Sequence, residues 1–335
     1  MKEPAPVSVV IPAYNSENYI RDAIESVLGQ SLPVSEIIVV DDGSSDRTSE
    51  IARSLGAKVI RQPNRGVSAA RNVGIRAALN EWVAFIDQDD LWAPEKIESQ
   101  WAAIQLYPDV GIVSCHMSWF EHDSESGCSL ELDLRDALNP KEHDDGSVRY
   151  FHRVKDELPF SRMSDYVSSV LIRRDLLLSV GMFNEDLTQN EDLECFLRVI
   201  AQCPLANVKK SLVQRRIHGQ NSSLNNPELV TASYYQILDW LLAYPHKYPP
   251  GAGGAYNRTF SVGLISAGRN LLAEGRMREA RALFRRTLGR VYSARALFLW
   301  CVSFLSPAGF EHLLAIKRKF AKWFAREKSS QRTKS

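Results

Sequence analysis

Three aspartates stand within four residues at the end of an apolar run: Asp87, Asp89 and Asp90 follow WVAFI in the stretch WVAFIDQDDLW. Carboxylates repel one another, so this cluster is unfavourable unless a positive group lies beside it. Mg²⁺ and Mn²⁺ prefer one or two carboxylates together with water and phosphate oxygens. The cluster therefore predicts a divalent-metal site with positions open for a diphosphate. Asp89 or Asp90 could instead cap the helix expected near Pro94, but one cap needs only one carboxylate.

A second pair of carboxylates, Asp41 and Asp42, ends another apolar run in EIIVVDDGSS. A turn into a helix would explain Ser44 and Ser45 as capping residues, but it does not explain two aspartates. One of them is therefore a candidate to accept a hydrogen bond from a nucleobase imide or a ribose hydroxyl. Arg71, one turn into the following helical segment, either pairs with phosphate or lies on a solvated helix face.

These residues follow a regular alternation of strand and helix signals. The predicted strands are 7–14, 36–43, 58–62, 82–87 and 111–115, and the predicted helices between them are 17–31, 44–56, 66–80 and 94–107. Continuous apolar strands separated by helices indicate a parallel sheet that is covered on both faces. Ligands of such sheets bind beyond the carboxyl ends of the strands, so both carboxylate clusters and the arginine are expected at one edge.

The rest of the chain is less regular. Residues 121–165 are rich in Asp, Glu, His, Ser and Arg and read as long loops, whereas 190–203 is helical and 206–219 resembles a strand. A polar turn cluster at 221–227 marks a predicted boundary, and the pattern after it is helical.

Composition excludes some classes of protein. The formal net charge of +1 gives no argument for a nucleic-acid partner, and none is expected. The five cysteines show no metal-ligand spacing, which favours reduced thiols. The N-terminus lacks a secretory pattern, and the longest apolar stretch, 296–305, is about half of the ~20 residues that span a bilayer. A cytoplasmic protein is therefore expected.

The C-terminal residues 311–335 carry eight Lys or Arg against two Glu. Within them, 311–328 places apolar side chains on one helix face and basic ones on the other. This pattern predicts peripheral contact with an anionic surface, such as the inner face of the cytoplasmic membrane. The alternative is a helix that packs on the protein's own catalytic domain.

Five motifs resemble family 2 glycosyltransferases in order and spacing, over roughly residues 7–223. They are VSVVIPAYNSENYIRDAIESVLGQSLPVSEIIVVDDGSSDRT, NRGVSAARNVGI, FIDQDDLW, GMFNEDLTQNEDLECFLR and QRRIHGQNSS. The resemblance implies an α/β fold of GT-A type, a Rossmann-like sandwich with a mainly parallel central sheet, followed by an α-helical C-terminal region. It implies a catalytic domain at 1–223, with a nucleotide-binding half at about 1–90 and an acceptor-binding half at 91–223, and a helical region at 224–335.

The same resemblance implies an inverting hexosyl or related transfer from a nucleotide-diphospho-sugar, most simply a UDP-sugar, to a hydroxyl of a sugar or lipid-linked sugar acceptor. The pathway would be polysaccharide or glycoconjugate biosynthesis. The implied cofactor is Mn²⁺ or Mg²⁺. The implied donor-binding residues are Pro12, Ala13, Tyr14, Asn15, Asp41, Asp42, Arg71, Asp87, Gln88 and His218; the implied metal ligands are Asp89, Asp90 and His218.

Asp192, in NEDLECFLR, stands where the family places its general base. Displacing a nucleoside diphosphate requires that the acceptor hydroxyl lose its proton, and one carboxylate near the acceptor does this. A carboxylate at a helix start could instead cap that helix.

Two other functions are weighed against this one. A sugar-nucleotide nucleotidyltransferase would carry a Gly-rich phosphate loop with a lysine after the first strand, and PAYNSENY has neither. A non-catalytic sugar-nucleotide-binding protein on the same scaffold would usually have lost the Asp-x-Asp or the base, and both are present.

Overall fold

A computed structural model describes residues 3–121, 147–151, 167–218, 275–288 and 294–304, with isolated positions between 232 and 272. The chain forms two compact units, Met1–Ala255 and Tyr256–Ser335. The domain limits predicted at residues 90 and 223 stay predictions. Most of the irregular segment predicted at 121–165, and the whole amphipathic segment 311–328, lie outside the described residues.

The first unit is built on one mixed sheet. The strands in the described ranges are β1 (Ala5–Ala13), β2 (Val34–Asp41), β3 (Lys58–Arg61), β4 (Trp82–Phe85), β5 (Leu91–Trp92), β6 (Ile112–Glu121), β7 (Val148–Phe151), β8 (Leu171–Arg173) and β9 (Leu205–Ile217). Their order is β3-β2-β1-β4-β8-β6-β9-β5, and β7 pairs with β9. Strands β3, β2, β1 and β4 run parallel, as do β6 and β9, while β8 is antiparallel to both of its neighbours. The predicted α/β class with a mainly parallel sheet is confirmed.

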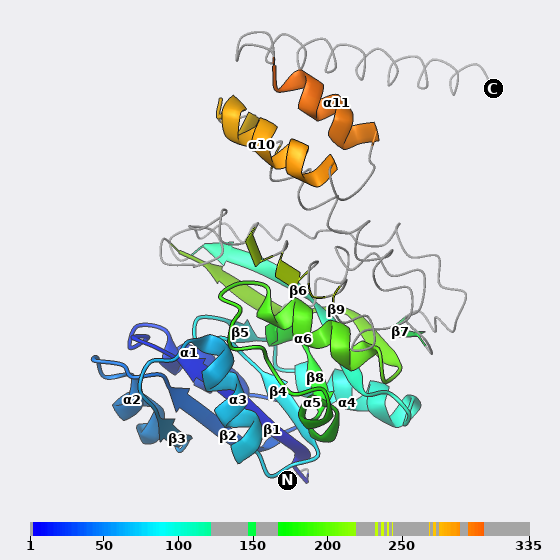
Figure 1. The fold of residues 1–335 in the computed structure, drawn as a ribbon. Coiled ribbons are helices and arrows are strands. Elements are labelled where there is room, and N and C mark those ends of the chain that lie inside the picture. Colours follow the sequence, from blue (N-terminus) through cyan, green and yellow to red (C-terminus); the bar gives the residue numbers. More distant parts are fainter. Residues whose placement is uncertain are drawn as a thin grey trace, which may run out of the picture. The chain divides into compact units, whose positions relative to one another are not determined.

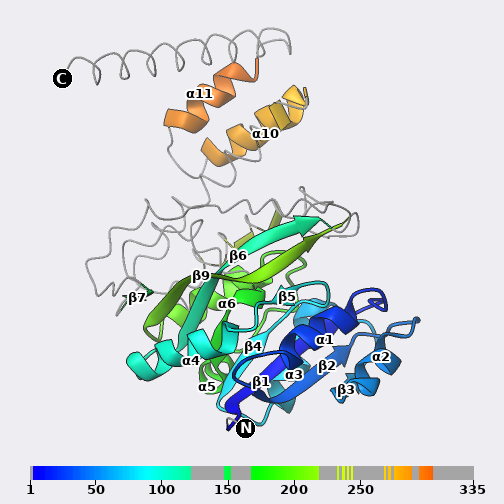
Figure 2. The same cartoon turned by 180° about the vertical axis from the view of Figure 1, so that it is seen from behind.

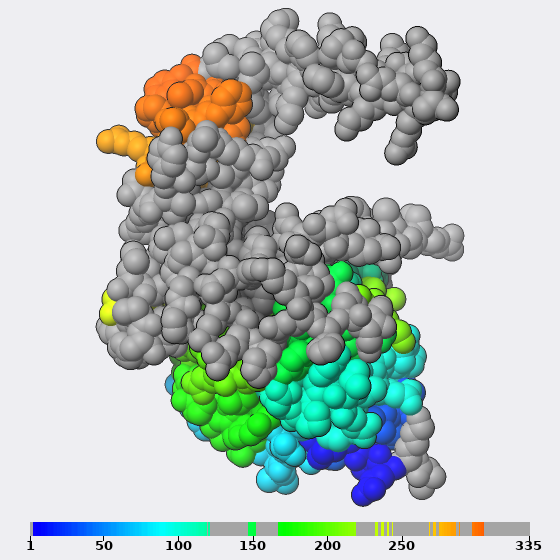
Figure 3. All heavy atoms as spheres, turned by 90° about the vertical axis from the view of Figure 1, so that its right-hand side faces the viewer, coloured from blue at the N-terminus to red at the C-terminus, as the bar shows by residue number. Residues whose placement is uncertain are grey.

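Helices cover both faces of this sheet. They are α1 (Ile20–Leu28), α2 (Thr48–Ser54), α3 (Val67–Ala77), α4 (Lys96–Leu106), α5 (Arg174–Ser179) and α6 (Glu191–Ile200), with a short 3₁₀ turn at Val167–Ser169. Helices α3, α5 and α6 lie on the face seen in Figure 1, and α1 and α4 lie on the face seen in Figure 2. Figure 3 shows residues around α4, in cyan, beside green residues of the 167–218 segment. The apolar runs of β1 and β4 are buried because both faces are covered.

Helix α3 approaches β1 so closely that only a glycine fits between them. A Cβ atom added at Gly74 would lie 2.3 Å from Cγ1 of Val10, which is fully buried. This contact places α3, and Arg71 with it, directly over the parallel half of the sheet.

We expect Gly74→Ala to lower the free energy of unfolding by about 1–3 kcal/mol, because the extra methyl group must displace packed atoms. Urea unfolding measures this cost. In a Val10→Ala background the clashing methyl groups are absent, and the same substitution is expected to cost much less. An equal cost in both backgrounds would contradict the packing explanation.

The second unit contains the helices α10 (Met277–Leu288) and α11 (Ala294–Val302). They pack on each other through a small apolar core of Leu272, Met277, Ala280, Phe284, Leu299 and Val302. Helices in this region agree with the helical character predicted after residue 227. Across the described part of the chain, no helix has the length and apolar character needed to cross a membrane.

Candidate active site

A cavity of about 640 Å³ lies at the carboxyl ends of β1, β2 and β4. Helix α3, the N-terminus of α6 and the end of β9 complete its wall. Eleven predicted site residues line it: Pro12, Ala13, Tyr14, Asn15, Asp42, Arg71, Asp87, Gln88, Asp89, Asp192 and His218. The parallel strands thus bring residues from both halves of the first unit to one edge of the sheet, as the strand-end rule predicts.

The residues after β1 form one rim of the cavity. The backbone N–H of Tyr14 donates to Oε1 of Gln88 at 2.7 Å, which ties the loop after β1 to the loop after β4. The Tyr14 side chain is 46% exposed and free of the core. Asn15 has a positive φ of 47°, and its Oδ1 accepts from the N–H of Ser45 at 2.8 Å. These contacts shape an open, polar rim with one exposed ring.

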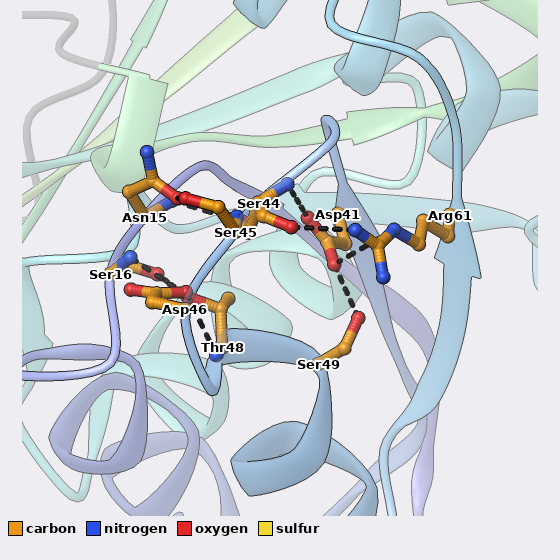
Figure 4. Close-up of polar contacts among 9 residues, drawn as sticks. All are labelled: Asn15, Ser16, Asp41, Ser44, Ser45, Asp46, Thr48, Ser49 and Arg61. Carbon is orange, nitrogen blue, oxygen red and sulfur yellow. Dashed lines mark hydrogen bonds and ion pairs between the residues drawn. The ribbon is translucent and has the colours of Figure 1, made fainter.

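Asp41 does not line the cavity, although it is one of the predicted donor-binding residues. Its fully buried carboxylate accepts hydrogen bonds from the N–H of Ser44 at 2.8 Å and from the hydroxyl of Ser49, and Arg61 lies 3.9 Å away (Figure 4). Burial acts to raise the pKa of Asp41, but the hydrogen bonds from Ser44 and Ser49 hold it below its ordinary value. Asp41 therefore secures the turn between β2 and α2 from outside the lining of the cavity.

Asp42 lines the cavity and also holds the loop between β3 and α3. Its Oδ1 accepts from Nε2 of Gln62 at 2.7 Å and from the N–H of Arg65 at 2.9 Å, and its Oδ2 accepts from the N–H of Gly66 at 2.8 Å. A carboxylate has about four acceptor positions. The fourth position of Asp42 can accept a hydrogen bond from a ligand, and the three bonds within the protein hold the carboxylate in place.

Asp90 differs from its neighbours in the Asp cluster because it is fully buried and does not line the cavity. Its Oδ2 accepts from the hydroxyl of Ser168 at 2.6 Å, and the same hydroxyl oxygen accepts from the N–H of Asp87 at 3.0 Å. Burial and the charges of Asp87 and Asp89 raise its pKa well above the ordinary value. Asp90, which was predicted as a metal ligand, is thus held by Ser168 outside the lining of the cavity, and it is not the cap of α4, which begins at Lys96.

Asp89 and His218 face the cavity as a pair. Nε2 of His218 lies 2.8 Å from Oδ2 of Asp89, and both side chains are largely shielded from solvent. Burial and the charge of Asp87 raise the pKa of Asp89, and the contact with His218 opposes that rise. The cavity has more acidic than basic side chains, so a cation would be favoured beside Asp89.

The side chains of the cavity could supply only part of the ligands that a metal ion needs. Within the described ranges, no group of three or more His, Cys, Asp or Glu side chains has the arrangement of a metal site. The pair of Asp89 and His218 offers one carboxylate and one imidazole nitrogen toward the cavity. Mg²⁺ and Mn²⁺ sites of this kind take their remaining ligands from substrate phosphates and water. The residues therefore fit a metal that arrives with a diphosphate.

Arg71 joins the two acidic parts of the site. Its side chain is 3% exposed; NH2 donates to Oδ1 of Asp87 at 2.8 Å and NH1 donates to Oε1 of Glu191 at 2.6 Å. The guanidinium also lies 5.3 Å from the centre of the Phe183 ring. Burial alone would lower its pKa, but the charges of Asp87 and Glu191 raise it further above its ordinary value. The sequence left Arg71 either paired with phosphate or on a solvated helix face. In the structure it is buried, and both of its terminal nitrogens contact carboxylates.

Asp192 is the second residue of α6, and Asn190, which immediately precedes the helix, has a φ of 58°. The helix begins at Glu191, so Asp192 is inside it and does not cap it. Burial and the charge of Glu191 raise the pKa of Asp192 to about 7, although Arg71 acts to lower it. A pKa near the working pH is the property that suits a general base.

Sequence reasoning missed several cavity residues. They are Tyr19, Val67, Ala70, Thr188, Gln189, Asn190 and Glu191. Arg215, which the sequence leaves as either a phosphate contact or a surface charge, also lines the cavity. Glu191 had a visible signal, since it directly precedes the predicted base. Tyr19 had none, because its place beside His218 depends on how the chain returns through β9.

Comparison with known proteins identifies the family. Residues 8–177, about half of the chain, match Glycosyl transferase family 2. The chain belongs to this family. An uncharacterized glycosyltransferase of Rickettsia typhi is 31% identical to this family 2 chain over 238 residues, which are 69% of the chain and 71% of the relative. A putative glycosyltransferase of Bacillus subtilis, EpsH, is 37% identical over 150 residues, 43% of the chain and 42% of the relative.

Other relatives are longer than the shared region. An uncharacterized glycosyltransferase of Rickettsia felis is 30% identical over 221 residues, and the chain spans only 35% of its length. The similarity therefore concerns a shared family 2 domain.

Solved structures agree on the fold. The family 2 chain superposes on S. aureus TarS in complex with UDP-GlcNAc with a TM-score of 0.63 at 18% identity, covering 92% of the chain and 91% of that structure. The mannosyltransferase PcManGT from Pyrobaculum calidifontis, in complex with GDP-Man and Mn²⁺, gives a TM-score of 0.59 at 17% identity, covering 96% and 85%. The predicted GT-A fold is confirmed.

Proposed function

We propose that this protein is a metal-dependent inverting glycosyltransferase, which moves a sugar from a nucleotide-diphospho-sugar to an acceptor hydroxyl. The observation that carries the proposal is that one cavity holds both a carboxylate with a pKa of about 7, Asp192, and the carboxylate–imidazole pair of Asp89 and His218. The nucleotide-sugars bound in TarS and PcManGT support this class of donor. The UDP-GlcNAc bound in TarS supports a UDP-sugar as the first donor to test.

In the proposed reaction, Asp192 acts on the acceptor, and Asp89 and His218 act at the diphosphate of the donor. Asp192 takes the proton of the acceptor hydroxyl, whose oxygen forms a bond to the anomeric carbon of the donor. The bond from that carbon to the diphosphate breaks, and the nucleoside diphosphate leaves with the electron pair. Attack from the side opposite the leaving group inverts the configuration. Asp89 and His218 would hold a divalent cation, which neutralises charge on the departing diphosphate.

The donor's nucleoside is assigned to the rim formed by the residues after β1 and β2. Asp42 keeps one acceptor position for a base or ribose donor, and the exposed Tyr14 ring offers a face for packing. Pro12, Ala13, Asn15 and Gln88 complete this rim.

We further propose that the acceptor is a sugar or lipid-linked sugar of polysaccharide or glycoconjugate biosynthesis. The putative function of the EpsH relative supports glycosyl transfer only, so this step rests on the sequence. The basic amphipathic segment 311–328 supports peripheral contact with the inner face of the cytoplasmic membrane, where a lipid-linked acceptor would be within reach.

The donor assignment predicts a metal-dependent thermal stabilisation. UDP at about 100 times its Kd is expected to stabilise the fold by about 3 kcal/mol in the presence of Mn²⁺. That corresponds to a Tm increase of several degrees, measured by thermal shift across a panel of UDP, GDP and their sugars. Asp89→Asn is expected to remove the part of the shift that depends on Mn²⁺.

The matched control is Asp186→Asn, an exposed aspartate that does not line the cavity. It is expected to keep the full shift. The proposed function fails if no nucleoside diphosphate stabilises the wild-type protein with or without Mn²⁺.

A further inference from the structure

The imidazole of the Asp89–His218 pair stacks on an aromatic ring that also lines the cavity. The Tyr19 ring stacks on the His218 imidazole with centroids 4.8 Å apart and an angle of 17° between the planes. Tyr19 directly precedes α1, whereas His218 directly follows β9, so the stack joins two segments that are far apart in the sequence. The ring is therefore placed where it restricts how the imidazole turns.

A buried arginine anchors the same group of residues. Arg216 lies on β9, two residues before His218, and is 4% exposed. Its Nε donates to the backbone oxygen of Asp89 at 3.2 Å, and its NH2 donates to Oδ2 of Asp22 in α1 at 2.9 Å. Its guanidinium carbon lies 5.4 Å from the centre of the Tyr19 ring. Arg216 thus ties the backbone of Asp89 to helix α1, which begins directly after Tyr19.

These contacts matter because the pair has only two side chains to offer a cation. An imidazole that is free to rotate would spend part of its time with Nε2 away from Asp89. The stacked ring excludes those rotamers, so the nitrogen and the carboxylate oxygen stay together before any ligand binds. Groups that orient metal-binding side chains in this way typically change metal affinity by about 10–100-fold when removed.

We propose that Tyr19 is a positioning residue for the cation and diphosphate end of the donor site: its ring holds His218 toward Asp89 and so sets the affinity for the metal-bound nucleotide. This inference rests on the proposed function. Tyr19 acts through His218 and has no part in the proton transfer at Asp192.

The test compares Tyr19→Leu, which removes the ring, with Tyr19→Phe, which keeps it. Mn²⁺ binding in the presence of UDP is followed by electron paramagnetic resonance of the free ion, and UDP binding without metal is followed by calorimetry. Tyr19→Leu is expected to weaken Mn²⁺ binding by about 10-fold or more. Tyr19→Phe is expected to stay within about twofold of wild type, because stacking needs only the ring.

Tyr107→Leu is the matched structural control. Tyr107 stacks on Tyr150 with centroids 4.5 Å apart and the same interplanar angle of 17°, and neither ring lines the cavity. This variant is expected to lower Tm without changing the Kd for Mn²⁺. A double variant of Tyr19→Leu with His218→Ala is expected to bind Mn²⁺ as weakly as His218→Ala alone, because the ring acts only through the imidazole.

Three results would overturn the inference. An unchanged Mn²⁺ affinity in folded Tyr19→Leu would reduce the ring to a structural role. An equal loss of UDP affinity without metal would make Tyr19 a direct nucleotide contact. A wild-type protein that binds neither UDP nor Mn²⁺ with UDP would overturn the proposed function itself, whereas the first two results leave that function standing.

Discussion

Asp192→Asn is expected to lower the rate of sugar transfer by about 10²–10⁴-fold, the usual contribution of a general base. Asparagine has nearly the same shape, so the cavity and the contacts of Arg71 with Asp87 and Glu191 are retained. The Kd for UDP with Mn²⁺ is therefore expected to stay within about twofold of wild type. Steady-state kinetics and calorimetry on the same preparation separate the two effects. Transfer at a wild-type rate would remove Asp192 from the role of base and leave the donor site unaffected.

The pKa of Asp192 adds a pH dependence to this prediction. A base with a pKa of about 7 is protonated and inactive below that pH, so kcat/KM of the wild type should rise about tenfold per pH unit up to about pH 7 and then level off. The residual activity of Asp192→Asn should lack this rise. A wild-type profile that is flat between pH 5 and 8 would contradict the assignment.

The same raised pKa has the opposite effect on stability. Because Asp192 binds its proton more tightly in the folded than in the unfolded chain, the fold loses stability as the pH rises from about 4 to about 7. Asp192→Asn cannot lose a proton, so its Tm should exceed that of the wild type at pH 8, and the difference should shrink toward pH 4. Asp186→Asn, at an exposed position, should show no such trend.

Much of this site could be predicted because strand ends have a fixed meaning in α/β sheets. The apolar runs ending at Asp41 and Phe85 are strands β2 and β4, and the residues that follow them converge on one cavity. What the sequence could not decide is which of two adjacent aspartates faces that cavity. Asp41 is the last residue of β2 and Asp42 follows it, whereas Asp89 and Asp90 lie in the turn after β4, which ends at Phe85. In each of these two pairs one aspartate lines the cavity and its neighbour does not. Which of the two lines it depends on the strand register and on the path of the loop.

Contacts between segments that are distant in the sequence could not be predicted either. Arg71 and Glu191 are joined by a 2.6 Å ion pair across 120 residues, and no local pattern in the sequence connects them. The prediction that Arg71 meets phosphate rested on its position in a motif. Its burial between two carboxylates arises because Asp87, after β4, and Glu191, at the start of α6, both reach Arg71 on α3. Glu191 was visible only as the neighbour of Asp192, with no role assigned.

That burial leads to the largest expected effect on stability. Arg71→Ala should lower the free energy of unfolding by about 3–5 kcal/mol, because it leaves the carboxylates of Asp87 and Glu191 shielded from water without their shared cation. Urea unfolding measures the loss. Arg65→Ala is the matched control, since Arg65 is 60% exposed and pairs with Glu185 at 2.8 Å. A surface ion pair of this kind contributes about 0–1 kcal/mol to the free energy of unfolding.

Arg71→Lys keeps the charge and tests the geometry if the alanine variant does not fold. A lysine ammonium is a single point charge and cannot reach two carboxylates in the forked arrangement of a guanidinium, so an intermediate loss of stability is expected. Arg71 acts to lower the pKa of Asp192, so a variant that weakens this interaction should raise that pKa. The rising limb of the kcat/KM profile should then move above pH 7. Glu191→Gln in the same background removes a negative charge beside Asp192 and should move that limb back. A loss of stability no larger than that of Arg65→Ala, with an unshifted pH profile, would show that Arg71 does not hold the two acidic parts of the site together.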